Sequence, residues 1–142
     1  MMDRRRLLLA TSGAVFAAPW AAAAQPPGKL HRIGWLSSAP PTAPELWPLW
    51  PALVDGLREL GWVEGKDYVF ERRFTEGRSE RFAALAAELV QAKVDIIVSV
   101  GTLGTMAAKR ATSTIPIVML NVGDPVGSGL VASLGRPGAN VT

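Results

Sequence analysis

The stretch Val94-Asp95-Ile96-Ile97-Val98-Ser99-Val100 is a nearly continuous apolar, β-branched run that ends at Gly101-Thr102. Such a run is typical of a strand that is covered on both faces, as strands of parallel sheets are. The residues that follow predict a helix, because four apolar positions share one helical face. They are Leu103, Met106, Ala107 and Ala111. This strand-then-helix unit indicates an α/β fold.

Further strands are predicted on either side of this unit. Residues 30–36 form an apolar run, residues 68–74 carry charges that favour the edge of a sheet, and residues 117–122 follow Pro116. Residues 140–142 begin another extended segment. Strands that alternate with helices predict a doubly wound parallel sheet with right-handed crossovers.

Helical spacing predicts two more helices and a short fourth one. The first follows a Pro-rich loop at residues 39–51 and ends at Gly61 as a C-cap, and the second starts at Ser79 as an N-cap. A short fourth helix is expected at residues 127–134. The apolar stripes are Leu53, Val54, Leu57 and Leu60 in the first helix, and Phe82, Leu85, Ala86, Leu89 and Val90 in the second.

Charge and cysteine content exclude several classes of function. The chain has 142 residues, the length of one domain, and a formal net charge of +3. Residues 1–24 contain three arginines and one aspartate, which leaves 12 basic and 11 acidic residues elsewhere. This balance predicts no electrostatic footprint for nucleic acid. Because the sequence has no Cys, disulfides, thiolate metal sites, Cys nucleophiles and a lipidated N-terminal Cys are excluded.

We expect residues 1–24 to be a cleaved signal peptide. Asp3-Arg4-Arg5-Arg6 is a basic start, residues 7–18 are apolar, and Ala22-Ala23-Ala24 supplies the small residues that signal peptidase reads. Cleavage is expected after Ala24. An uncleaved anchor is the alternative, but the apolar stretch is short for a membrane span, which needs about 20 residues. The arginines suit a Sec or a twin-arginine route, and the mature chain is predicted to be periplasmic.

In a parallel sheet of this kind, ligands bind beyond the carboxyl ends of the strands. Gly101-Thr102 starts a helix there, whose free N–H groups favour an anion such as a carboxylate. Asp124 could accept an ammonium group, and the hydroxyls donate or accept. The set suits a small polar or zwitterionic ligand, although such residues are also common caps and turn residues. The candidates are Ser37, Ser38, Thr75, Glu76, Gly101, Thr102, Asn121 and Asp124.

Motifs of catalysis and cofactor binding are absent from the sequence. His31, the single His, lies near the start of a strand and so at the opposite end from the ligand edge. No G-x-S-x-G, H-E-x-x-H, G-x-G-x-x-G or P-loop pattern occurs. Trp35, Trp47, Trp50 and Trp62 could stack on a ligand or partner, but packing is the commoner use. We predict no catalytic residue, no metal and no cofactor.

An ordered set of short motifs runs through residues 30–142. They are Ile33-Gly34-Trp35-Leu36, Gly56-Leu57-Arg58-Glu59-Leu60-Gly61-Trp62-Val63-Glu64-Gly65-Lys66, Glu76-Gly77-Arg78, Leu85-Ala86-Ala87-Glu88-Leu89-Val90, Thr114-Ile115-Pro116-Ile117-Val118, Gly123-Asp124-Pro125-Val126-Gly127-Ser128-Gly129-Leu130-Val131 and Leu134-Gly135-Arg136-Pro137-Gly138-Ala139-Asn140-Val141-Thr142. In this order and spacing they resemble the extracytoplasmic substrate-binding proteins of a family of ABC importers, in which some relatives are linked to aromatic amino acids.

This resemblance implies a periplasmic-binding-protein type I fold, in which two α/β lobes close on a ligand. It implies a non-enzymatic component that captures a small organic, possibly amino-acid-like, solute for an ABC permease in the membrane, with no nucleic-acid partner. Carried over by position, the ligand-binding residues are Ser37, Ser38, Gly101, Thr102, Asn121 and Asp124.

Residues 25–142 correspond to the N-terminal lobe alone, because relatives of this family continue into a hinge strand and a second lobe. We expect either a fragment of a longer binding protein or a one-lobe product with weak or no binding, since a lone lobe cannot close by a hinge. Two other classes stay open. One is an enzyme, for which the sequence offers no nucleophile–base pair, and the other is a ligand-sensing or interaction lobe without a transport role.

Overall fold

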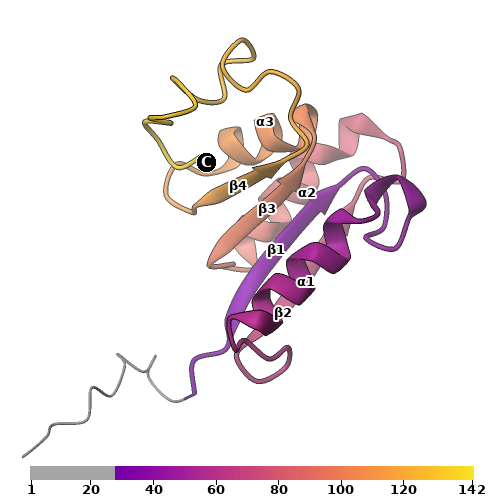
Figure 1. Ribbon diagram of the computed structural model, residues 1–142. Helices are drawn as coiled ribbons and strands as arrows, with labels where there is room; N and C mark the ends of the chain where they lie inside the picture. Colours follow the sequence, from indigo (N-terminus) through magenta and orange to yellow (C-terminus); the bar gives the residue numbers. More distant parts are fainter. Residues whose placement is uncertain (1–27) are drawn as a thin grey trace, which may run out of the picture.

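The computed structural model describes residues 28–142, and the predicted signal peptide at residues 1–24 lies outside them. The sheet has four parallel strands in the order β2-β1-β3-β4 (Figure 1). They are β1 (His31–Ser37), β2 (Tyr68–Phe74), β3 (Ile96–Val100) and β4 (Ile117–Leu120). This arrangement confirms the predicted α/β fold, and it places the charged strand β2 at an edge of the sheet.

Helices lie on both faces of this sheet. α2 (Phe82–Gln91) and α3 (Thr102–Ala111) pack side by side on one face, and α1 (Leu49–Glu59) lies on the other (Figure 1). Two 3-10 turns, η1 (Pro44–Leu46) and η2 (Ser79–Arg81), precede α1 and α2. The molecule is therefore doubly wound, with one layer of helices on each side of the strands.

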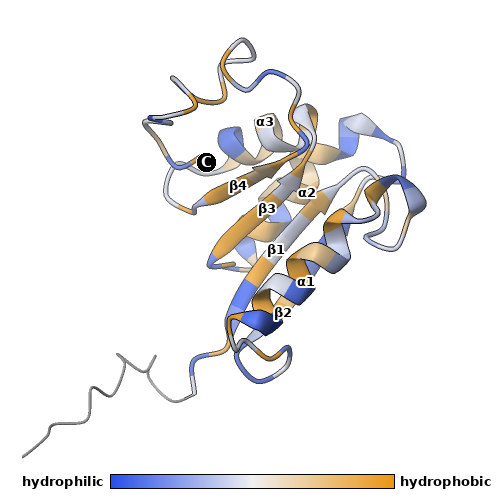
Figure 2. Cartoon of the chain, viewed as in Figure 1, coloured by the Kyte–Doolittle hydropathy of each residue, from blue (hydrophilic) through white to orange (hydrophobic). Residues whose placement is uncertain are grey.

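Each face of the sheet buries its own apolar cluster. Leu36 and Ile97 pack with Leu89 of α2, whereas Trp35 and Val98 belong to the cluster on the side of α1. Side chains alternate between the two faces along β1 and β3, as the pleat of a strand requires. β3 and β4 are accordingly among the most hydrophobic parts of the chain (Figure 2).

The four strands end together at one edge of the sheet. The register pairs Ser37 with Phe74, Leu36 with Ser99, and Val100 with Leu120. The segments that follow the strands, residues 38–48, 75–78, 101–102 and 121–124, therefore leave the sheet side by side. We call these four segments the carboxyl edge.

The predicted extended segment at residues 140–142 continues the sheet beyond β4. Val141 forms a parallel bridge with Ile117. The Ile117 N–H donates to the Asn140 carbonyl at 2.7 Å, and the Thr142 N–H donates to the Ile117 carbonyl at 2.8 Å. The outer side of β4 is thus partly covered by the last described residues.

The predicted helix at residues 127–134 is wrong, because this segment forms turns. Gly127 and Gly129 are poor helix residues, and Gly129 has a φ of +74°. The Lys109 ammonium donates to the carbonyls of Gly129 and Leu130 at 2.7 and 3.1 Å. These carbonyls accept hydrogen bonds from a side chain outside the segment, in place of the backbone hydrogen bonds of a helix.

Several predicted boundaries shift as well. α1 begins at Leu49, inside the predicted Pro-rich loop, since a proline in the first helical turn costs no hydrogen bond. Ser79 is not the N-cap of α2, because it starts η2 and α2 begins at Phe82. β4 ends at Leu120, where Asn121 takes a φ of +54°.

Candidate functional site

Backbone hydrogen bonds tie neighbouring segments of the carboxyl edge together. The Thr75 N–H donates to the Ser37 carbonyl at 3.1 Å, and the Gly77 N–H donates to the Ser38 carbonyl at 3.1 Å. On the other half of the sheet, the Gly101 N–H donates to the Leu120 carbonyl at 2.8 Å. The structure therefore brings the predicted residues to one edge, as two linked pairs of loops.

The turn from β3 into α3 is built around Gly101. Its φ of +83° is a left-handed conformation that favours glycine. The Thr105 hydroxyl donates to the Gly101 carbonyl at 2.8 Å and lies 2.6 Å from the Ser99 hydroxyl. Both hydroxyl side chains are fully buried. They hold the first turn of α3 in place.

Ser99 and Thr105 are not among the residues predicted from the sequence, although both are polar and lie close to the predicted ligand loop. The signal was present in the sequence, because one hydroxyl precedes and one follows the Gly101-Thr102 junction. A hydroxyl inside a buried strand needs a partner, and the nearest donors and acceptors lie in the following helix turn.

Three predicted residues keep their side chains available at the carboxyl edge. Ser38 and Asn121 are exposed, and Thr102 is partly exposed as the first residue of α3. Their side chains make no hydrogen bond to another residue of the described range 28–142. Side chains at this position and with this freedom are able to bind a polar ligand.

Ser37 and Asp124 already use their side chains within the fold. Ser37 is fully buried, accepts the Trp35 indole N–H at 2.8 Å and donates to the Ala39 carbonyl at 2.6 Å. Asp124 is exposed, and one of its carboxylate oxygens accepts the Gly127 N–H at 2.8 Å. Both residues shape loops of the carboxyl edge, and Asp124 retains a second carboxylate oxygen.

Thr75 and Glu76, the candidates after β2, also serve the loops. Thr75 is fully buried, and its hydroxyl lies 3.5 Å from the Ser38 carbonyl. Glu76 has a φ of +56° and forms an ion pair with Arg81 at 3.7 Å. Their side chains connect the segment after β2 to its neighbours.

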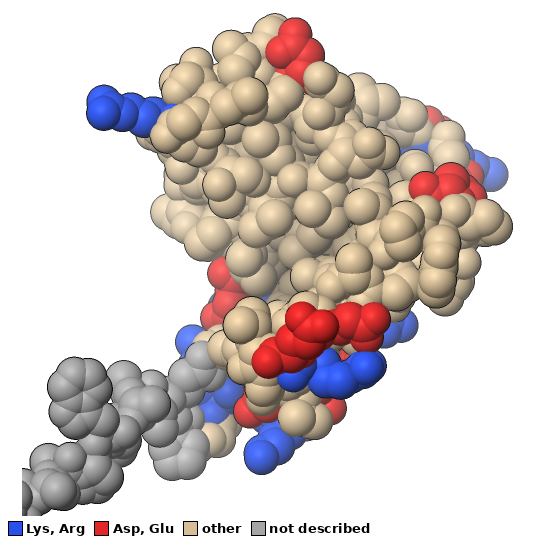
Figure 3. All heavy atoms as spheres, in the orientation of Figure 1, with Lys and Arg blue, Asp and Glu red and all other residues tan. Residues whose placement is uncertain are grey.

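An apolar hollow lies on the face of the sheet that carries α1. It has a volume of about 620 Å³, and its walls include Leu53 and Leu57 of α1 with Val98 and Val118 of the sheet. Charged side chains lie mainly around the periphery of this face (Figure 3). A zwitterionic ligand needs polar partners when it leaves water, so the carboxyl edge suits it better than this apolar hollow.

His31 lies at the first residue of β1, opposite the carboxyl edge. Its imidazole stacks edge-on against Trp62 with ring centres 5.3 Å apart, and its Nδ1 lies 3.8 Å from Asp95. This placement agrees with the expectation that His31 sits at the wrong end of the sheet for a ligand site.

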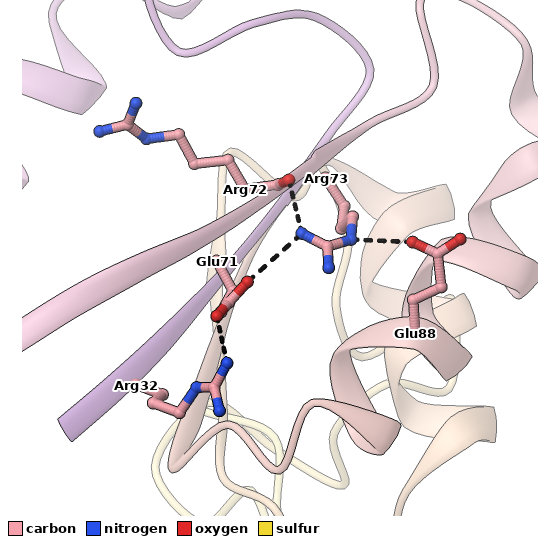
Figure 4. A network of polar contacts seen from close by, with 5 residues as sticks. All are labelled: Arg32, Glu71, Arg72, Arg73 and Glu88. Carbon is pink, nitrogen blue, oxygen red and sulfur yellow. Dashed lines mark hydrogen bonds and ion pairs between the residues drawn. The ribbon is translucent and has the colours of Figure 1, made fainter. Parts of the chain in front are cut away.

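A network of ion pairs between side chains lies on the surface at β2. The Glu71 carboxylate accepts a hydrogen bond from the Arg32 guanidinium and lies 3.6 Å from the Arg73 guanidinium, which also donates to Glu88 at 2.8 Å (Figure 4). The hydrogen bond from Arg32 lowers the pKa of Glu71 most strongly. The hydrogen bond from the Arg32 backbone N–H likewise lowers the pKa of Asp95. These shifts come from contacts that join strands, not from the carboxyl edge.

The described range holds neither a metal-binding cluster nor a membrane-spanning helix. Within residues 28–142, no group of three or more His, Asp or Glu side chains could hold a metal ion. No helix in the same range is long and apolar enough to span a membrane.

The comparison with protein families is decisive. The model of the family described as ABC transporter substrate binding protein matches residues 44–142. The chain belongs to this family. The match contains η1, all three α-helices and three of the four strands. Because this family consists of binding proteins, the prediction of a non-enzymatic protein is confirmed.

Individual proteins and solved structures also resemble this chain. A tyrosine-binding protein of Clostridioides difficile (strain R20291) is 34% identical over 89 residues, which is 63% of this chain and 26% of the relative. A domain from Streptococcus pneumonia, solved in complex with L-Trp, is 29% identical with a TM-score of 0.73. The region that matches covers 80% of this chain and 38% of the solved chain.

A ligand-free, open structure of a substrate binding protein with adhesive properties from Clostridium difficile is 28% identical, with a TM-score of 0.74. The overlap again covers 80% of this chain and 38% of the solved one. The chain thus spans about a quarter to two fifths of the length of these relatives. The family resemblance seen in the sequence is confirmed.

The lowered pKa of Glu71 predicts a loss of stability in acid. The folded pKa lies below the ordinary value of 4.5, so the stabilisation is complete above that value and disappears as the pH falls through the folded pKa. We expect the free energy of unfolding of Glu71→Gln, measured by urea titration between pH 6 and pH 3, to fall less than that of the wild type.

The matched control is Glu45→Gln, because Glu45 is exposed and forms no ion pair within the described range. This control should follow the wild-type pH profile. Equal slopes for Glu71→Gln and the wild type would show that the bond to Arg32 does not stabilise the fold.

Proposed function

We propose that this protein is the extracytoplasmic solute-binding component of an ABC importer. It captures a small, amino-acid-like organic solute and delivers it to a membrane permease. The observation that carries this proposal is membership of the substrate binding family over residues 44–142. Relatives named for tyrosine binding or solved with L-Trp support an amino acid as the ligand.

The carboxyl edge forms the wall of the ligand site in this proposal. The first N–H groups of α3 have no partner within their helix, so they receive the carboxylate of the ligand together with the Thr102 hydroxyl. Ser38 and Asn121 supply further donors and acceptors. Ser37 and Asp124 shape the loops, and the second oxygen of Asp124 accepts the ligand ammonium.

Export and domain organisation are part of the same proposal. Residues 1–24 act as a signal peptide that is cleaved after Ala24, and the route is Sec or twin-arginine. Residues 25–142 form the N-terminal lobe of a two-lobed, type I binding protein in the periplasm. Closure of a second lobe on the carboxyl edge would exclude water and strengthen the polar contacts to the solute.

Calorimetric titration with a panel of amino acids and related carboxylates tests the binding function. The protein recovered from the periplasm of its host is expected to bind at least one member of the panel. Thr102→Val should weaken that binding about 10-fold, because a hydrogen bond to a charged group is lost. The fold should be unaffected, since the Thr102 side chain is not buried.

Thr114→Val is the control for this substitution. Thr114 is exposed and precedes β4, so it lies at the opposite end of the sheet from the carboxyl edge. Its affinity should equal that of the wild type. A wild-type protein that is silent across the whole panel would contradict the amino-acid ligand, and unchanged affinity in Thr102→Val would remove Thr102 from the site.

The intact mass of the periplasmic protein tests export and domain organisation. The expected mass is that of a chain whose first residue is Gln25, because small residues at positions 22–24 direct cleavage after Ala24. Two lobes predict a mass about twice that of residues 25–142, following the typical size of paired domains. Recovery from the cytoplasm with residues 1–24 attached would contradict the proposed localisation.

A further inference from the structure

Trp47 is the one tryptophan of the described range that the fold leaves uncovered. It is 68% exposed, and its indole makes no hydrogen bond or ring contact with another residue of that range. By contrast, Trp35 is fully buried and packs edge-on against Trp50, with ring centres 5.1 Å apart. Trp62 stacks against His31. Three of these four indoles serve packing, and Trp47 does not.

The segment that carries Trp47 is firmly held. Its neighbour Leu46 is only 4% exposed and belongs to the apolar cluster beneath α1. The Trp47 N–H donates to the Pro44 carbonyl at 3.1 Å. Pro44 and Pro48 also restrict the backbone on both sides. An indole presented on a restrained segment loses little conformational entropy when a ligand covers it.

Trp47 also lies at the end of the sheet where the solute is proposed to bind. It belongs to residues 38–48, the segment of the carboxyl edge that connects the end of β1 to the start of α1. Ser38, one of the available polar side chains, begins the same segment. The exposed indole and the polar groups are therefore presented at the same edge of the molecule.

We infer that Trp47 is a specificity-determining residue, whose indole stacks on the aromatic side chain of an amino-acid ligand. This inference rests on the proposed function. The first turn of α3 and the Thr102 hydroxyl bind the carboxylate that all amino acids share. Trp47 adds a contact that only an aromatic side chain completes, because paired aromatic rings gain energy beyond their buried area.

The test compares Trp47→Ala and Trp47→Phe with the wild-type protein, purified from the periplasm of the host. Calorimetric titration with L-Trp, L-Tyr and L-Leu gives the affinities. Trp47→Ala should bind L-Trp and L-Tyr about 10-fold more weakly, and Trp47→Phe should stay within about 3-fold of the wild type. Any affinity for L-Leu should be equal in all three proteins.

Leu60→Ala is the matched control, because Leu60 is 77% exposed and follows α1 at the other end of the sheet. It should bind as the wild type does. Unchanged affinity of Trp47→Ala for L-Trp and L-Tyr would overturn the inference but leave the proposed function standing. The same holds if the wild type binds L-Leu but neither L-Trp nor L-Tyr. A wild type that binds no amino acid would overturn both.

Discussion

The double burial of β3 is the constraint on which the other features depend. Ile97 and Val98 face opposite apolar clusters, and β3 is hydrogen-bonded to β1 on one side and β4 on the other. Packing on both faces and hydrogen bonds along both sides thereby fix the position of β3. Since Val100 ends the strand beside Leu120, the start of α3 and the loop after β4 must leave the sheet together. The carboxyl edge follows from the packing of the core.

Polar residues at the carboxyl edge and directly beside it divide into those that hold the loops and those that face outward. Ser37, Ser99 and Thr105 are fully buried and hydrogen-bonded, because an unpaired hydroxyl in the core would be costly. Ser38 and Thr102 reach solvent at the same edge. A ligand bound at this edge would meet side chains whose supporting hydrogen bonds are already made, which would lower the cost of ordering the site on binding.

Apolar periodicity in the sequence predicted the strands, α2 and α3, because the pattern of burial on a sheet or helix is local. It also predicted the common edge of the candidate residues. Caps and turns were the alternative roles expected for Ser37 and Asp124, but the sequence could not name their hydrogen-bond partners, because these depend on turn geometry. The prediction of a helix at residues 127–134 was wrong, because the Lys109 ammonium of α3 donates hydrogen bonds to the Gly129 and Leu130 carbonyls.

We propose that the solute binds at the carboxyl edge and not in the apolar hollow beside α1. Backbone hydrogen exchange, measured by mass spectrometry with and without saturating L-Trp, tests it most directly. Binding at the carboxyl edge should slow exchange in residues 38–48, 101–105 and 121–127, with no change in residues 60–67 at the opposite end. Slower exchange confined to α1 and the strands beneath it would instead place the solute in the apolar hollow.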